Sequence, residues 1–196
     1  MWVSNPNSLG RCRYLLRGGM PLPYIPFIEV EPMHGMTKRE YQITDEQELR
    51  RILDTAKVLR LGIAVDNVPY IYPMNYGYTL EDGKLKLYLH SAVKGNKLDL
   101  LRRSPNVCFE LDCDNVPFEG KVACQYGLAY SAISGRGTAV LVEDVEDKKE
   151  AMSILMKTQT GKDFEFNERL VSIVAVIRLD VTEFTAKYRP IPENLR

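Results

Sequence analysis

The chain has 196 residues, of which 45% are hydrophobic, and its 26 basic side chains balance its 26 acidic ones. This length fits one domain, or one domain with an extension, and the apolar content suffices for a buried core. A neutral chain without a basic surface pattern is not expected to bind nucleic acid. No run approaches the roughly 20 apolar residues that a membrane-spanning helix requires, so no membrane contact is expected.

Residues 1–35 differ in composition from the rest of the chain. They contain Pro6, Pro21, Pro23, Pro26 and Pro32 and show no sustained hydrophobic period. We interpret 1–35 as an N-terminal extension or arm and 36–196 as the folded domain. The apolar stretch Tyr14-Leu15-Leu16 is too short for the core of a signal peptide, so we expect a cytoplasmic protein.

The cysteines are Cys12, Cys108, Cys113 and Cys124, and no two of them have the C-x-x-C spacing of a metal or redox motif. A zinc site made of the last three together with His90 can be drawn, but its spacing matches no common zinc pattern. Reduced thiols in the core are the favoured interpretation. We therefore predict no metal.

Predicted elements begin at Thr44. Thr44 and Gln47 have the spacing of a capping box, and they open a helix over 45–57 that carries Leu49, Ile52, Leu53 and Ala56 on one face. Strands are predicted over 58–65, 70–78 and 85–90, separated by turns at Asp66-Asn67 and at 81–84. Strands that follow one another through short turns indicate an antiparallel meander.

The second half of the chain alternates helices and longer strands. The pattern predicts a helix over 95–103, a strand over 106–112, a loop over 113–121, a strand over 128–142, a helix over 145–158 and a strand over 171–185. About six antiparallel strands with intervening helices indicate a small β-barrel with helical caps. Gly135 and Gly137 lie inside a strand with no helix behind them, so they are not a dinucleotide fingerprint. They favour a bend in a barrel strand, with the close approach of a flat ligand as the alternative.

The stretch from His90 to Lys97 carries the strongest chemical signal. A strand ends at His90 and Ser91, a turn follows, and a helix opens with Lys94, Asn96 and Lys97 in or near its first turn. The helix dipole disfavours cations at that end, whereas backbone amides, lysines, a hydroxyl and an imidazole would together bind an anion. We therefore expect a phosphorylated ligand here. The alternative is a solvated turn whose lysines lie in bulk water.

Five segments resemble a known family in their order and motifs, and they are Ala56–Gly62, Tyr72–Tyr78, Leu89–Leu101, Pro105–Glu110 and Tyr130–Ala139. With them, residues 37–190 resemble the FMN-binding split-barrel superfamily of pyridoxamine phosphate oxidase, and within it the nitroimidazole-resistance (Nim) family most. The resemblance implies a mainly β (α+β) fold, a six-stranded antiparallel split β-barrel with a few peripheral helices. It also implies a homodimer with FMN at the subunit interface.

By position, the resemblance places the cofactor against two segments. The backbone of Tyr72, Pro73, Met74, Asn75 and Tyr76 would flank the ring system, and the phosphate would rest on His90, Ser91, Asn96 and Lys97. Many relatives carry Arg where this chain has Asn96, so a bidentate phosphate clamp is missing. The tyrosines at 70, 72, 76 and 78 would share one face of the predicted strand, either paving an interface or flanking the flavin, and packing is favoured.

The resemblance implies an FMN-dependent oxidoreductase that reduces a small electron-poor substrate, with a nitroaromatic as one candidate. His90 is then the candidate catalytic residue, because the ordinary pKa of histidine suits proton delivery near neutral pH. A His that only caps the strand end is the alternative for this residue. A non-catalytic FMN- or haem-binding dimer for storage or sensing, with His90 as a haem ligand, is the alternative function. Pyridoxamine phosphate oxidation itself is disfavoured because the tail Lys187–Pro190 contains no histidine.

Overall fold

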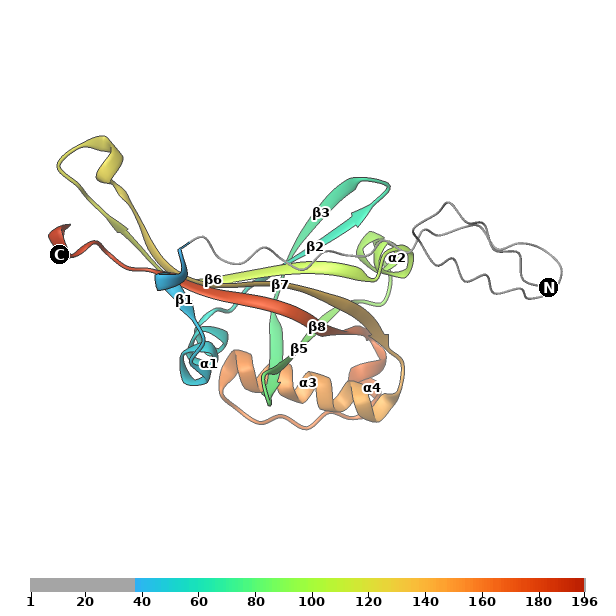
Figure 1. The fold of residues 1–196 in the computed structure, drawn as a ribbon. Coiled ribbons are helices and arrows are strands. Elements are labelled where there is room, and N and C mark those ends of the chain that lie inside the picture. Colours follow the sequence, from blue (N-terminus) through green and yellow to red (C-terminus); the bar gives the residue numbers. More distant parts are fainter. Residues whose placement is uncertain (1–37, 196) are drawn as a thin grey trace, which may run out of the picture. The chain divides into compact units, whose positions relative to one another are not determined.

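The computed structural model describes residues 38–195, in which long antiparallel strands carry the fold and helices lie around them (Figure 1). The strands are β1 (Gln42–Ile43), β2 (Leu59–Val65), β3 (Val68–Met74), β4 (Tyr76–Glu81), β5 (Lys84–Ala92), β6 (Asn106–Phe118), β7 (Gly127–Val142) and β8 (Val174–Arg189). The helices are α1 (Glu46–Thr55), α2 (Asn96–Arg103), α3 (Val145–Thr160) and α4 (Glu168–Ser172), with short turns η1 (Arg39–Tyr41), η2 (Ala123–Gln125) and η3 (Glu193–Leu195). The expected N-terminal extension over 1–35 lies outside the described residues.

The strands form one sheet in the order β3-β2-β6-β7-β8-β5-β4, with β1 pairing on β8. The outermost strands β3 and β4 are consecutive in the chain, with only Asn75 between them. The sheet therefore curls until its two edges meet at Asn75 and stays open beyond that point, as a split barrel does. The predicted mainly β (α+β) split barrel is confirmed, but within 38–195 it has eight strands and not six. The predicted strand 70–78 is in fact two strands, and β1 was not predicted.

Two tight turns fix the register of the first hairpins. Asp66 and Asn67 both have positive φ, 53° and 61°, and join β2 to β3 with Val65 opposite Val68. Asp82 and Gly83 do the same between β4 and β5, with φ of 49° and 72°. Two consecutive residues of this conformation match the right-handed twist of the flanking strands. Both predicted turns are confirmed.

One hydrophobic core fills the barrel. The alternate residues Leu59, Leu61 and Ile63 of β2 are buried, as the period of two in a strand requires. Helices α1 and α2 add Leu49, Ile52, Leu53, Leu98 and Leu101 to the same core. The predicted first helix is confirmed, but its N-cap is Asp45 and not Thr44. The Asp45 carboxylate accepts from the amide of Glu48 at 2.9 Å, which satisfies a free amide and suits the positive end of the helix.

Strand β6 is longer than the sequence indicated. The predicted loop over 113–121 is wrong, because β6 continues to Phe118 after a register shift between Cys113 and Val116. Asp114 lies in this bulge with φ of 59°, and its carboxylate accepts from Arg51 of α1 at 2.7 Å. The ion pair lowers the pKa of Asp114. A hydrogen bond from another element therefore maintains a strand where turn-like residues had suggested a loop.

Helix α3 packs closely on β4. A Cβ atom added to Gly77 would lie 2.4 Å from the Cα of Leu155, so only glycine permits this approach. The last strand begins at Val174 and not at 171, because Asn167 caps the short helix α4 through the amide of Leu170 at 3.0 Å. Among the described helices, none is long and apolar enough to cross a membrane.

Gly135 and Gly137 of β7 face the backbone of β8. Added Cβ atoms would lie 2.5 Å from the carbonyl oxygen of Glu183 and 2.2 Å from that of Asp180. The register between β7 and β8 shifts at the same place, between Arg136 and Gly137. These contacts agree with the interpretation of the two glycines as residues that allow a barrel strand to bend.

Candidate functional site

The expected anion site lies where β5 passes into α2. The turn ends at Gly95, whose φ of 148° favours glycine, and α2 begins at Asn96 with no side chain capping it. The amide of Leu98 bonds to the Gly95 carbonyl at 3.0 Å. Within residues 38–195, the amides of Asn96 and Lys97 have no acceptor. The start of α2 therefore presents unpaired donors and the positive end of the helix dipole.

The ammonium of Lys97 reaches across the opening between β3 and β5, which we call the seam. Its Nζ donates to Met74 Sδ at 3.4 Å and lies 5.3 Å from the centre of the Tyr72 ring. Lys97 is half-buried, and burial lowers its pKa. No carboxylate among the described residues pairs with this ammonium. A weakly accepting sulfur and a ring face are poor partners for a half-buried cation, so the position favours an anion.

His90 lies near Lys97 at the end of β5. Its Nδ1 is buried and has no hydrogen-bond partner in the described part of the chain. Burial lowers the pKa of His90, and the Lys97 ammonium lowers it further. The imidazole is therefore neutral near pH 7. An anion held beside both groups would raise both pKa values and favour a protonated imidazole.

Asn96 and Tyr72 join α2 to β3 across the seam. Asn96 Nδ2 donates to the Tyr72 hydroxyl at 3.1 Å. Tyr72 of β3 is paired with Leu61 of β2, so both side chains point to the same face, the inner side of the sheet. The structure thus brings together four of the expected site residues, Tyr72, Met74, Asn96 and Lys97, with His90 close by.

Ser91 shares the core-facing side of β5 with Leu87 and Leu89, whereas His90 shares the other side with Tyr88, and Pro73 lies on the outer side of β3. Ser91 follows His90 directly on β5, so the two side chains point to opposite faces of the strand. Pro73 likewise points away from the face that carries Tyr72 and Met74. Of these three residues, only Ser91 therefore lies on the side of the sheet that carries Tyr72 and Met74.

The free edge of β3 offers backbone groups. β3 is an outermost strand, and Pro73 is paired with Arg60 of β2. Because proline has no N–H, a proline in a paired strand turns its nitrogen away from its neighbour. The carbonyl of Pro73 and both polar groups of Ile71 therefore face the open edge. These two carbonyl acceptors and one N–H donor are suited to hydrogen bonds with the polar edge of a flat heterocycle.

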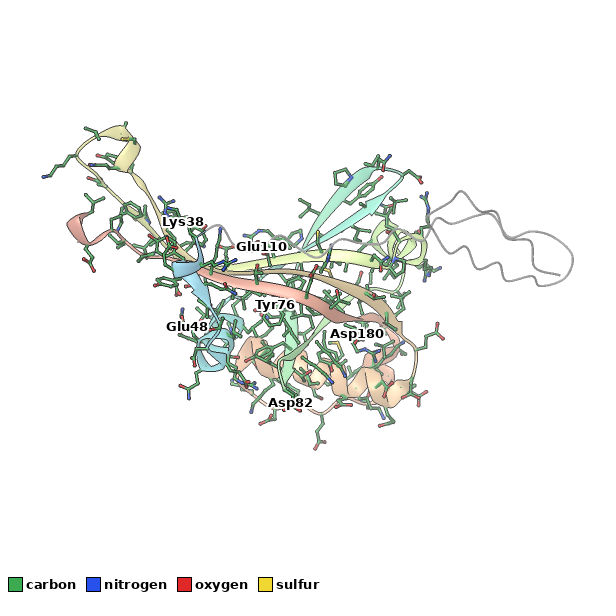
Figure 2. The ribbon with its side chains drawn as sticks, viewed as in Figure 1. Lys38, Glu48, Tyr76, Asp82, Glu110 and Asp180 are labelled. Atoms are coloured by element: carbon green, nitrogen blue, oxygen red, sulfur yellow. The ribbon has the colours of Figure 1, made fainter. Side chains whose placement is uncertain are left out.

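Asn75 and Tyr76 serve mainly to hold the fold. Asn75 Nδ2 donates to the Lys57 carbonyl at 3.2 Å and to Gln159 Oε1 at 3.3 Å. The Tyr76 side chain is fully buried in the interior (Figure 2), and its hydroxyl donates to the Leu53 carbonyl at 2.7 Å. Burial raises the pKa of Tyr76. Any contact of Tyr76 with a cofactor is therefore confined to its backbone.

Two sequence expectations about this region need correction. The tyrosines at 70, 72, 76 and 78 do not share one strand, because the chain passes from β3 to β4 at Asn75. Gln159, which donates from Nε2 to the Tyr76 carbonyl at 2.7 Å, was not among the candidate residues. It lies on α3, far along the chain, and a single glutamine in a helix carries no local signal that could have identified it.

A separate groove of about 760 Å³ lies between α1, β4 and the end of α3. Its walls include Arg50, Asp54, Lys57, Tyr78 and Gln159. The Tyr78 hydroxyl donates to Asp54 Oδ1 at 2.9 Å, and burial together with this bond raises the pKa of Tyr78 to about 12. Lys57 Nζ donates to the Thr158 carbonyl at 2.9 Å. These polar groups satisfy one another, in contrast to those at the seam.

An eight-stranded sheet that curls without closing, with an anion-binding turn beside the opening, defines a split-barrel protein. The sequence profile of the family described as pyridoxamine 5'-phosphate oxidase matches residues 45–188. The chain belongs to this flavin-binding family. A search of curated proteins found no match.

Solved structures share this fold. A crystal structure from Bacteroides thetaiotaomicron, named as a candidate 5-nitroimidazole antibiotic resistance protein, is 31% identical over 75% of this chain and 86% of that chain, with a TM-score of 0.64. Flavocytochrome Anf3 from Azotobacter vinelandii is 18% identical over 81% and 74% of the two chains, with a TM-score of 0.65. An FAD- and haem-binding protein from Mycobacterium smegmatis is 15% identical over 76% and 73%, with a TM-score of 0.63.

Proposed function

We propose that the seam binds FMN, with the phosphate at the start of α2. The observation that carries this proposal is the half-buried ammonium of Lys97, which no carboxylate of the described residues neutralises. A phosphate there would accept from this ammonium and from the amides of Asn96 and Lys97. It would also stabilise a proton on His90. Ser91 and the free edge of β3 would complete the site.

The proposed activity is the reduction of a small electron-poor substrate by an FMN-dependent oxidoreductase. FMN supplies the electron-transfer chemistry when bound. The chain binds and orients the cofactor, and His90 holds a proton beside the anion for delivery to the substrate. The relative from Bacteroides thetaiotaomicron, at 31% identity, makes a nitroaromatic the first substrate to test. A cytoplasmic location stays a prediction.

The proposed functional unit is a homodimer. Ile71 is 70% exposed on the outer face of β3, and the exposed Cys108 of β6 and Ala64 of β2 lie on the same face. Small side chains and an exposed isoleucine on a sheet face suit close packing against a second copy. Arg60 and Glu110 form an ion pair of 3.0 Å beside them, which gives the face a polar rim.

Haem binding is the second candidate function, and His90 is the observation that favours it. Metals bind the neutral imidazole, and burial keeps His90 neutral near pH 7 with its Nδ1 unpartnered among the described residues. The absorbance spectrum of the purified protein separates the two cofactors. A Soret band would indicate haem, and flavin bands would indicate FMN.

Replacing Lys97 with Met should sharply reduce the preference for FMN over riboflavin, which lacks only the phosphate. We expect the wild type to bind FMN about 10- to 100-fold more tightly than riboflavin, since a hydrogen bond to a charged group contributes about 1.5–3 kcal/mol. Titration of the flavin-free protein, followed by flavin fluorescence, measures both affinities. Lys86→Met, at an exposed position of the preceding strand β5, is the control and should keep the preference.

A stability measurement shows that this loss is not caused by unfolding. Lys97→Met removes a half-buried charge, so in the absence of flavin it should unfold at the same urea concentration as the wild type or a higher one. Equal affinity of the wild-type protein for FMN and riboflavin would contradict the proposed phosphate site.

Replacing His90 with Gln should slow the reduction of substrate much more than it weakens FMN binding. Loss of a positioned proton donor typically costs about 100-fold or more in rate. The measurement is the reoxidation, by a 5-nitroimidazole without oxygen, of protein whose FMN has been chemically reduced. A variant that reacts as fast as the wild type would exclude His90 as the proton donor.

Replacing Ile71 with Asp should convert the homodimer into a monomer, because it places a charge in the proposed interface. Size-exclusion chromatography with light scattering measures the mass in solution. Ile173→Asp is the matched control, since Ile173 is 67% exposed but lies before β8, away from this face. This control variant should remain dimeric. A monomeric wild type, or a dimeric Ile71→Asp variant, would contradict the proposed interface.

A further inference from the structure

Gln159 ties the last turn of α3 to the point where the sheet is split. Its Nε2 donates to the Tyr76 carbonyl at 2.7 Å, and its Oε1 accepts from Asn75 Nδ2 at 3.3 Å. Asn75 Nδ2 also donates to the Lys57 carbonyl at 3.2 Å. The Gln159 amide therefore bonds through its oxygen to Asn75, the single residue between the two edge strands, and through its nitrogen to Tyr76, the next residue.

The orientation of both amides is fixed by their partners. The carbonyls of Tyr76 and Lys57 can only accept, so Gln159 and Asn75 must each present an NH₂ group to them. The remaining oxygen of Gln159 then faces the NH₂ group of Asn75, as observed. The three bonds are mutually consistent, which makes the network a specific clamp on the backbone at 75–76.

The end of α3 is a firm support for this clamp. Gly77 lets the helix approach so closely that an added Cβ atom would lie 2.5 Å from the amide nitrogen of Leu155. Lys57 Nζ donates to the Thr158 carbonyl at 2.9 Å, which adds a second contact to the last turn. Gln159 therefore directly follows a part of the helix that is held in place by contacts of Leu155 and Thr158 with other elements.

The clamp is next to the residues that contact Lys97. Met74, whose sulfur accepts from Lys97 Nζ at 3.4 Å, directly precedes Asn75, and Tyr72 lies two residues before Met74 on the same face. A change in the path of the chain at Asn75 would move these side chains and the free edge of β3 together. It should not move α2 to the same extent, because α2 is held by its own core residues Leu98 and Leu101.

We propose that Gln159 is a positioning residue, which sets the width of the seam and so the fit of the ring system of the cofactor. The inference rests on the proposed flavin site. Gln159 acts through Asn75 and Tyr76 and not through the phosphate. Loss of the Gln159 amide should therefore weaken the binding of FMN and of riboflavin in the same proportion, whereas loss of the Lys97 ammonium should weaken the binding of FMN alone.

The test compares Gln159→Met, which keeps the shape and removes both hydrogen bonds, with Gln159→Glu, which keeps only the acceptor. Each variant should bind FMN and riboflavin about tenfold more weakly than the wild type, because one or two hydrogen bonds are lost. The ratio of the two affinities should stay at the wild-type value. Thr160→Val is the control, since the Thr160 hydroxyl bonds only near its own helix end, to the carbonyl of Met156 and the amide of Lys162.

Amide hydrogen exchange of the flavin-free protein provides a readout that does not depend on the cofactor. Exchange at residues 74–76 should rise in Gln159→Met and stay unchanged in Thr160→Val. Unchanged exchange there, unchanged flavin affinity, or a loss confined to FMN would each overturn the positioning role. A wild type that binds no flavin would overturn the proposed function, while the exchange data would still decide whether Gln159 holds the seam.

Discussion

The fold and the site both depend on one constraint, the passage of the chain from one edge of the sheet to the other within a single residue. β3 ends at Met74 and β4 begins at Tyr76, although five strands separate them in the sheet order, so the sheet must curl almost into a barrel for this short link to be made. The edges meet at Asn75 and diverge on either side of it. The divergence leaves β3 with an unpaired edge, and the seam beside this edge is where α2 places its first turn.

Electrostatics distinguish the seam from the rest of the described surface. Elsewhere, cations such as Arg51 and Arg60 pair with carboxylates of neighbouring strands. At the seam, Lys97 and His90 are both half-buried, and burial lowers the pKa of each. Such an arrangement costs stability in the absence of a ligand and is typical of binding sites, where a partner completes the interaction. The groove beside α3 has the opposite character, since its Tyr78 hydroxyl bonds to Asp54 and its Lys57 ammonium bonds to the Thr158 carbonyl.

Local patterns predicted much of the architecture. The alternation in β2, the helical period of α1 and the paired turn residues at 66–67 and 82–83 all act over a few residues, and each was read correctly. The predictions from sequence failed where contacts between residues distant in the chain determine the local structure. Arg51 of α1 keeps β6 extended through a bulge, and Gln159 of α3 holds the link at Asn75. Sequence spacing carries no information about such long-range hydrogen bonds.

The candidate site was predicted in part for the same reason. His90, Asn96 and Lys97 follow one another across a strand, a turn and a helix start, so chain connectivity alone brings them together. That Tyr72 and Met74 belong to the same site as Lys97 was expected only through the resemblance to a family, and the direct contacts of Lys97 with both were not predicted. Tyr76 was assigned to the same surface, but its hydroxyl bonds to the carbonyl of Leu53 in the core.

The central claim is that one ligand bridges the two sides of the seam. Amide hydrogen exchange of the wild-type protein with and without FMN tests it most directly. The account predicts that FMN slows exchange in two separate segments at once, the start of α2 around 95–98 and the edge strand around 71–75. Slower exchange in only one of these segments, or only in the groove between α1 and α3, would contradict it.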